Sequence, residues 1–170
     1  MNLSSLSDVI KEKQKTLFVL CGFPYSGKTT AAKRLAEITG ATHIAIDDFF
    51  YEHGYDWDSN KLPNKEGWNQ IFADSFTVTK DALSENKNVL YDSTNQTRES
   101  RDKLRNIAKA VDAETVVIFF DVPQEMVWER WENNKKNRER SVVSKELVQM
   151  TLDAFETPTE DESVYRIVSK

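Results

Sequence analysis

An octapeptide near the start of the chain constrains the fold more than any other feature. Residues 22–29 read GFPYSGKT, which fits the spacing G-x-x-x-x-G-K-[ST], and they follow the strand-like run TLFVL. A strand, a glycine loop and a helix in this order let consecutive backbone N–H groups surround an anion at the positive end of the helix. A side chain at either glycine would obstruct that anion. The motif therefore predicts a phosphate-binding loop rather than an ordinary turn.

We expect the whole loop to contact the phosphates of a purine nucleotide. The Lys28 ammonium can reach the β- and γ-phosphates, and the Thr29 hydroxyl can bind Mg²⁺. ATP and Mg²⁺ are the expected cofactors, although another purine triphosphate stays open. The predicted cofactor-binding residues are Gly22, Phe23, Pro24, Tyr25, Ser26, Gly27, Lys28, Thr29 and Thr30.

Apolar periodicity along the chain alternates between two patterns. Short β-branched runs predict strands at 16–21, 42–46, 89–91, 115–120 and 164–168. Apolar residues recurring every three or four positions predict helices after residue 27, from about 68, over 98–111, after Pro123 and from about Ser144. This alternation is typical of an α/β fold with a parallel sheet and crossover helices. The fourth run, TVVIFF, is apolar throughout and is expected to be a central strand.

Length and composition bound the kind of molecule. The 170 residues suit one domain, 1–170, and the formal net charge of -5 does not attract polyanions to the molecule as a whole. The lone Cys21 excludes an internal disulfide, and no apolar run reaches the roughly 20 residues that span a bilayer. We therefore expect a cytoplasmic protein with no membrane partner, either a monomer or a homodimer.

Missing motifs disfavour two classes of nucleotide-binding protein. The pair Asn-Lys occurs at 60, 64, 86 and 134, each time without the Asp that guanine-specific GTPases carry two residues after the Lys. Motor and remodelling ATPases carry Asp-Glu after an apolar strand, whereas Ser93 follows Asp92 here. The remaining large class is the small kinases, in which catalysis is mostly positioning and charge neutralisation.

Carboxylates at the ends of predicted strands are candidates for the proton acceptor and the metal site. Asp47 and Asp48 follow the second strand and Asp92 follows the third. Ligands of open α/β sheets bind beyond the carboxyl ends of the strands, so these groups face the phosphate loop. We predict Asp47 as the catalytic base, with Asp48 left open, and Asp92 with Thr29 at the metal. The alternative is that these residues cap helices or lie in solvated turns.

Two segments of unusual composition are predicted to cover the site. Residues 130–140 hold five basic side chains and suit a lid over the phosphates, at about 130–143, in which Arg130 binds the nucleotide; a solvated helix face is the alternative. Residues 49–68 form an aromatic-rich insertion predicted to bind the acceptor. Its candidate pocket residues, which could instead simply cover the core, are Phe49, Phe50, Tyr51, His53, Tyr55, Trp57 and Trp68.

Together these features resemble the P-loop kinases grouped with phage polynucleotide 5′-hydroxyl kinase, the zeta-type toxins and chloramphenicol phosphotransferase. Besides the loop, the similar segments are IAIDD, VLYDSTNQTRESR and FETPTEDESVYRI, and the similarity runs from about Thr16 to Val168. The resemblance implies a three-layer P-loop NTPase fold with five parallel strands in the order 2-3-1-4-5. It also implies a catalytic lid arginine, matched best by Arg140 or Arg138, and it favours Asp47 as the base.

The predicted function is that of an ATP- and Mg²⁺-dependent kinase that transfers the γ-phosphate to a hydroxyl of a small molecule. The group often carries Arg three residues after the base, where this chain has Phe50, and this departure disfavours a phosphorylated or nucleic-acid acceptor. Two alternatives stay open. One is a polynucleotide 5′-hydroxyl kinase, and the other is a nucleotide-gated binding module without transfer activity.

Overall fold

A five-stranded parallel sheet forms the centre of the protein. The computed structural model describes residues 2–168. The strands lie in the order β2-β3-β1-β4-β5, which confirms the predicted order. The middle position belongs to β1, while the apolar strand β4 is interior, between β1 and the edge strand β5. The strand bounds are β1 Thr16–Gly22, β2 Thr42–Ala45, β3 Val89–Asp92, β4 Glu114–Asp121 and β5 Val164–Val168.

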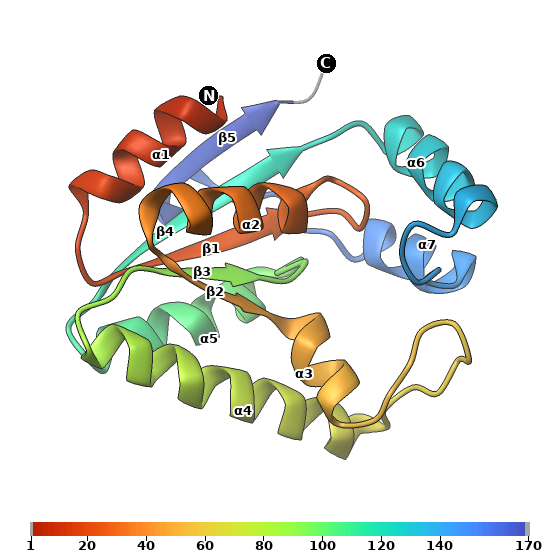
Figure 1. Cartoon of the computed structure of the whole chain (residues 1–170), viewed down its shortest axis with the longest axis horizontal. Helices are drawn as coiled ribbons and strands as arrows, with labels where there is room; N and C mark the ends of the chain where they lie inside the picture. Colours follow the sequence, from red (N-terminus) through yellow and green to blue (C-terminus); the bar gives the residue numbers. More distant parts are fainter. Residues whose placement is uncertain (1, 169–170) are drawn as a thin grey trace.

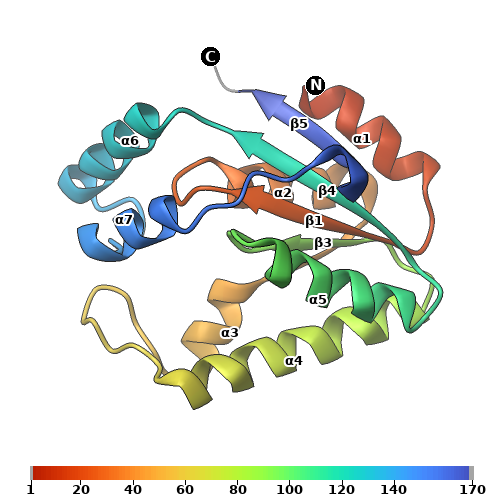
Figure 2. The same ribbon diagram turned by 180° about the vertical axis from the view of Figure 1, so that it is seen from behind.

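Helices cover both faces of the sheet. In Figures 1 and 2, α1 and α2 lie on one face, and α4 and α5 lie on the other. Parallel strands need such crossover helices, and with both faces covered the three interior strands β1, β3 and β4 are mostly buried, whereas the edge strands β2 and β5 are more exposed. The helix bounds are α1 Leu3–Glu12, α2 Lys28–Thr39, α3 Ile46–Glu52, α4 Lys65–Ser84, α5 Arg98–Lys109, α6 Gln124–Asn137 and α7 Lys145–Asp153.

Side chains on the central strand alternate between two cores. Phe18 and Leu20 pack in a buried cluster with residues of α1 and α2. Val19 and Cys21 pack in a second cluster with residues of α4 and α5. Successive strand residues point to opposite faces, so the continuous apolar run TLFVL fills both cores. The three-layer architecture predicted from the sequence is confirmed.

Two helices differ from the sequence expectation. Residues 3–12 were given no element, yet they form α1, which buries Leu6 and Ile10 against the sheet. The insertion was expected to be irregular from residue 49, whereas α3 occupies 46–52 and α4 begins at Lys65 rather than near Trp68. Fully buried Phe50 holds α3 in place. The sequence does carry a local signal for α1, because Asn2 caps the helix and Leu3, Leu6 and Ile10 recur at helical spacing, whereas α3 depends on the burial of Phe50.

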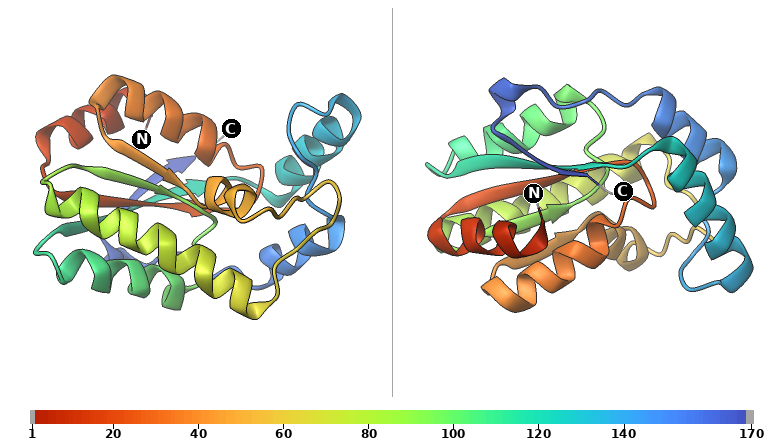
Figure 3. Two further views of the ribbon diagram at one scale, coloured as in Figure 1. Left: turned by 60° about the horizontal axis from the view of Figure 1, so that its bottom comes forward. Right: turned by 90° about the horizontal axis from the view of Figure 1, so that it is seen from above.

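The carboxyl ends of the strands all face one side of the molecule. There the β1–α2 loop, the start of α3, and the pair α6 and α7 come together, and the loop between α3 and α4 approaches the pair (Figures 1 and 3). A third buried cluster joins α6, α7 and Tyr25 of the β1–α2 loop. Residues 130–143, the segment predicted to be a lid and called the lid below, are thus anchored on the phosphate-loop side of the sheet.

Candidate active site

The loop between β1 and α2 is shaped by its two glycines. A Cβ on Gly22 would lie 2.9 Å from the Phe120 carbonyl oxygen, so only glycine fits between β1 and β4. Gly27 has a φ of +93°, and a Cβ there would meet nothing within 4 Å. Glycine is therefore needed at position 27 for its positive φ and not to avoid a clash within the protein. The open space beside it lets an anion approach the backbone.

Lys28 folds back into this loop from the first turn of α2. Its Nζ donates to the carbonyl oxygens of Gly22, at 3.0 Å, and Phe23, at 2.6 Å, and to Ser26 Oγ at 3.2 Å. The side chain is buried, and this burial lowers the pKa of Lys28 to about 8 against the opposing charge of Asp92. These hydrogen-bond acceptors are neutral, so a bound anion would stabilise the buried ammonium.

Asp92 lies at the end of β3, beside both β1 and β2. It is buried, and its Oδ2 lies 3.1 Å from Nε2 of His43 on β2. The sheet register, which aligns β2 with β3, brings His43 and Asp92 together although they are 49 residues apart in the sequence. Asp92 is also the strongest negative neighbour of Lys28.

Asp47 lies in the first turn of α3 and faces the same region. Burial raises the pKa of Asp47, and the charge of Asp92 raises it further, whereas Trp57, Arg140 and Lys28 lower it. The residue as a whole is exposed to solvent, so the carboxyl group remains accessible to an acceptor. A raised pKa moves a carboxylate toward the range in which it accepts a proton efficiently at neutral pH.

The lid touches the phosphate loop at Tyr25. Arg130 Nη1 donates to the Tyr25 carbonyl oxygen at 3.0 Å. The Arg140 guanidinium carbon lies 3.9 Å from the centre of the Tyr25 ring, a cation–π contact. Asn134 fixes the backbone on either side, because its side chain bonds both the N–H and the carbonyl of Arg140. The sequence predicted a role for these arginines, but it did not predict that both contact Tyr25.

Arg138 has a different neighbour from Arg140. It ends α6 with a φ of +53°, and its Nη1 lies 3.3 Å from Oδ1 of Asp58 in the insertion. Both side chains are exposed. In this arrangement Arg140 lies on the phosphate-loop side, and Arg138 lies against the insertion.

The aromatic residues of the insertion divide into core and rim. Phe50 is fully buried and stacks on Trp57 with ring centroids 4.2 Å apart, so it supports the site rather than lining an acceptor pocket. Trp57 and Trp68 are half-buried, and Tyr51 is exposed. His53 pairs at the surface with Asp74, 2.8 Å away. The expectation of a pocket wall at Phe50 is therefore corrected.

A buried ion pair beneath the site escaped the sequence reasoning. Arg101 donates through Nε and Nη2 to both oxygens of Glu162, and through Nη1 to the Asn95 and Glu156 carbonyls. Asn95 in turn donates to the Leu20 carbonyl. The network ties the segment before β5 to α5 and to the base of the phosphate loop. No local pattern links residues that lie 61 positions apart.

The remaining positions of the predicted set lie around this centre. Thr29 is half-buried beside Lys28, and Thr30 is exposed. The Phe23 ring packs on Phe155 with centroids 4.7 Å apart, and Pro24 is half-buried. The phosphate loop is therefore supported by the lid on one side and by the end of α7 on the other.

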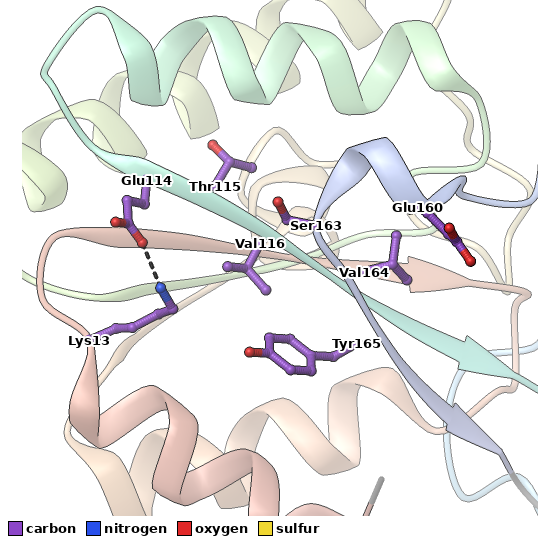
Figure 4. A pocket seen from close by; sticks show the side chains of 8 residues that line it. All are labelled: Lys13, Glu114, Thr115, Val116, Glu160, Ser163, Val164 and Tyr165. Atoms are coloured by element: carbon purple, nitrogen blue, oxygen red, sulfur yellow. Dashed lines mark hydrogen bonds and ion pairs between the residues drawn. The ribbon is translucent and has the colours of Figure 1, made fainter.

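A separate hollow of about 670 Å³ lies at the opposite edge of the sheet. Figure 4 shows it between the start of β4, the start of β5 and Lys13, which pairs with Glu114. It faces the amino ends of the strands, where ligands of open α/β sheets do not bind. The candidate catalytic residues Lys28, Asp47 and Asp92 lie at the carboxyl ends of the strands instead.

The loop geometry fits the phosphates of a nucleotide. Gly27 leaves the backbone open to an anion, and Lys28 supplies a buried positive charge. The Thr29 hydroxyl and the Asp92 carboxylate provide oxygen ligands of the kind that Mg²⁺ prefers. Within residues 2–168 no group of three or more His, Cys, Asp or Glu side chains is arranged as a metal site. Mg²⁺ bound through nucleotide phosphates needs only one or two protein ligands.

Residues 17–158 match the family described as AAA domain, AAA_33. The chain therefore belongs to this family. Together with the fold, the match confirms the predicted membership in the P-loop kinases. In the described part of the chain, no helix is long and apolar enough to cross a membrane.

One relative is similar in sequence, and solved structures are similar in fold. L-seryl-tRNA(Sec) kinase of Methanococcus maripaludis is 29% identical over 148 residues, which are 84% of this chain and 53% of that protein. The chain thus spans about half the length of that relative. Chaetomium thermophilum Kti12, solved with ADP-AlF3, superimposes with a TM-score of 0.71 at 20% identity, covering 89% of this chain and 88% of the other. A gluconokinase from Sinorhizobium meliloti 1021 gives 0.61 at 18%, covering 91% and 82%.

Proposed function

We propose that this protein is an ATP- and Mg²⁺-dependent kinase that phosphorylates a hydroxyl of a small molecule. The observation that carries the proposal is the meeting of Lys28, Asp47, Asp92 and Arg140, since the charges of the other three groups act on the pKa of Lys28 and likewise on the pKa of Asp47. They come from four separate segments of the chain. Such a set supplies phosphate binding, a proton acceptor and a metal-associated carboxylate at one place.

Each residue has a defined task in this proposal. Loop N–H groups and Lys28 hold the β- and γ-phosphates, and Arg140 neutralises charge that develops during transfer. Asp47 accepts the proton of the acceptor hydroxyl. As it does so, the hydroxyl oxygen forms a bond to the γ-phosphorus, and the bond from that phosphorus to the leaving ADP breaks. Mg²⁺, held near Thr29 and Asp92, supplies further neutralisation of the phosphate oxygens when bound.

The surroundings of Asp47 support a small, uncharged acceptor. The Trp57 side chain interacts with the Asp47 carboxyl group, and Tyr51 lies one helical turn further along α3. Such aromatic edges can form a shape-selective wall. Phe50, at the place where related kinases often carry an arginine, leaves α3 without that cation. The overall charge of -5 likewise disfavours a polyanionic acceptor, and we expect a cytoplasmic setting.

A hydroxyl carried on RNA is the second candidate. The relative that matches 84% of this chain is a kinase that its name assigns to seryl-tRNA. This candidate predicts affinity for RNA that falls steeply with added salt, because phosphate contacts release counterions. A nucleotide-gated binding module is the third, and it predicts ATP binding with no transfer to any acceptor.

One experiment separates the three functions. The full chain is incubated with γ-labelled ATP, Mg²⁺ and a panel of small hydroxyl compounds, 5′-hydroxyl oligonucleotides and aminoacylated tRNA. We expect label on a small compound, with Lys28→Ala inactive and Lys33→Ala, an exposed lysine on the same helix, fully active. Label on RNA supports the second candidate. ATP binding by calorimetry without any labelled compound supports the third.

A further inference from the structure

The lid and the insertion meet at Asp58. Its Oδ1 accepts a hydrogen bond from the Val142 backbone N–H at 3.0 Å and from Arg138 Nη1 at 3.3 Å. These partners are 80 and more positions away along the chain. Figures 1 and 3 show the loop between α3 and α4 approaching the connection from α6 to α7. One carboxylate thus bridges two segments that lie far apart in the sequence.

A second contact lies beside the first. Tyr51 is exposed as a residue, but partial burial of its hydroxyl raises its pKa, and a hydrogen-bonding interaction with the Ser141 side chain lowers it. Charges on Asp47, Asp56 and Asp58 raise that pKa as well. The lid therefore reaches the insertion through Arg138, Ser141 and Val142.

One of these contacts lies on the same helix as the candidate base Asp47. Asp47 and Tyr51 are four residues apart on α3, so they share one face of that helix. Ser141 follows Arg140, whose guanidinium lies on the Tyr25 ring of the phosphate loop. The lid therefore contacts the phosphate loop through Arg140 and the insertion through its next two residues, Ser141 and Val142.

We propose that Asp58 and Tyr51, with Arg138, Ser141 and Val142, form a clasp that encloses the acceptor. The proposal rests on the proposed kinase function and narrows its substrate class. The acceptor is a free small molecule that fits under the closed clasp, and a hydroxyl at the end of a polymer or on a folded RNA is excluded. Enclosure also keeps water from competing for the γ-phosphate.

The clasp is built to open readily. Asp58 and Arg138 keep 39% and 69% of their side chains exposed. Ion pairs in such surroundings are screened by water and salt and contribute little to stability. An acceptor can therefore enter and leave without unfolding of the lid, and enclosure is completed only while the bonds to Asp58 and Tyr51 are made.

Hydrogen exchange of the full chain tests the clasp independently of catalysis. Asp58→Ala removes both bonds of that carboxylate, and Tyr51→Phe removes the contact with Ser141 while keeping the ring. We expect exchange of the amides in residues 138–144 to rise about three-fold or more in the double variant. Asp81→Ala, an exposed carboxylate at the far end of α4, serves as the control. Unchanged exchange in the double variant overturns the clasp.

Product analysis tests the substrate class. In the panel described above, we expect label on small compounds only, and we expect the double variant to hydrolyse about three-fold more ATP to water for each phosphate transferred. Labelling of an oligonucleotide or tRNA at a rate comparable with the best small compound overturns the proposal. If nothing gains label, the proposed function fails instead, and the exchange experiment still decides whether the clasp exists.

Discussion

Tyr25 shows how much a single residue of the phosphate loop carries in this protein. It adopts a φ of +62°, its carbonyl accepts from Arg130, and its ring supports Arg140. The hydroxyl is buried among apolar side chains of the lid base and is without a hydrogen-bond partner among residues 2–168. A buried hydroxyl of this kind costs free energy that a phenylalanine would not. The ring is therefore the useful part of this side chain in the closed arrangement.

Tyr25→Phe should stabilise the protein. Removing the unpartnered hydroxyl is expected to raise the free energy of unfolding by about 1 kcal/mol. Tyr91→Phe is a matched control of opposite sign, because the Tyr91 hydroxyl bonds Ser75 Oγ at 2.8 Å inside the core. Urea denaturation of both variants measures the two effects. A loss of stability in Tyr25→Phe would show that its hydroxyl has a partner in solution.

Lys28→Ala should abolish most ATP turnover. The substitution removes the charge that the loop holds among its own carbonyl groups, and loss of one such stabilising group typically slows catalysis about 100-fold or more. Steady-state ADP release measures the effect, with Lys33→Ala as the control. Turnover within a few-fold of the parent protein would mean that the loop does not hold the transferred phosphate.

Asp47→Asn should slow transfer about 100-fold or more while leaving nucleotide affinity nearly unchanged, since a general base acts on the acceptor proton. Asp48→Asn is the informative comparison, because the sequence left the choice between the two open. Transfer rates and calorimetric affinities for ATP measure both effects. Slow transfer in Asp48→Asn alone would assign the base to Asp48.

At the scale of elements, packing contributes to both α1 and α3, and α3 depends on it more. The α1 segment LSSLSDVIKE mixes polar and apolar residues, and only contact with the sheet gives Leu6 and Ile10 their full burial. The α3 segment follows a strand directly and leads into a turn-rich loop, which makes it read as irregular. Its start orients Asp47, so this short helix matters more to the site than its length suggests.

Leu6→Ala should destabilise the whole fold rather than only α1. The side chain is fully buried in the same cluster as β1 and α2 residues, and truncating a buried leucine costs about 2–5 kcal/mol. Lys11→Ala, on the exposed side of α1, is expected to change stability by less than about 0.5 kcal/mol. Urea denaturation followed by far-UV circular dichroism measures both. An unchanged free energy of unfolding for Leu6→Ala would mean that the packing of α1 does not contribute to the stability of the fold.

At the scale of the whole molecule, the Arg101–Glu162 pair joins distant parts of the chain. Burial alone would raise the pKa of Glu162, but hydrogen bonds from Arg101 and the Thr159 backbone lower it to about 2. The ordinary value is 4.5. The folded state therefore favours the charged form, and the resulting stabilisation is complete above pH 4.5 and declines as the pH falls toward 2.

Glu162→Gln should weaken this acid dependence. At neutral pH the variant leaves Arg101 buried without its counter-charge, which is expected to cost about 3–5 kcal/mol. Between pH 4.5 and 2 its stability should fall less than that of the parent protein, because the titrating carboxyl group is gone. Glu160→Gln, an exposed neighbour, is the control. If the free energy of unfolding from urea denaturation falls equally for the parent protein and Glu162→Gln between pH 4.5 and 2, Glu162 is not the group responsible for the acid dependence.

The sequence by itself determined the local chemistry of this protein. The glycines and Lys28 of the phosphate loop, the strands with their β-branched runs, and the helix beginning after Ser144 are each specified by a few adjacent residues. Backbone conformation, capping and strand burial act over such short distances, so these features could be predicted. The resemblance to P-loop kinases supplied the strand order, which periodicity alone does not contain.

Only the tertiary structure decided which distant groups meet. The stack of Arg140 on Tyr25, the contact of His43 with Asp92, and the bonds from Asp58 to the lid join residues that no local pattern connects. The burial of Phe50 and the unpartnered hydroxyl of Tyr25 follow from the same packing. Side-chain contacts of this kind depend on how helices pack across the sheet, and that is a property of the whole chain in three dimensions.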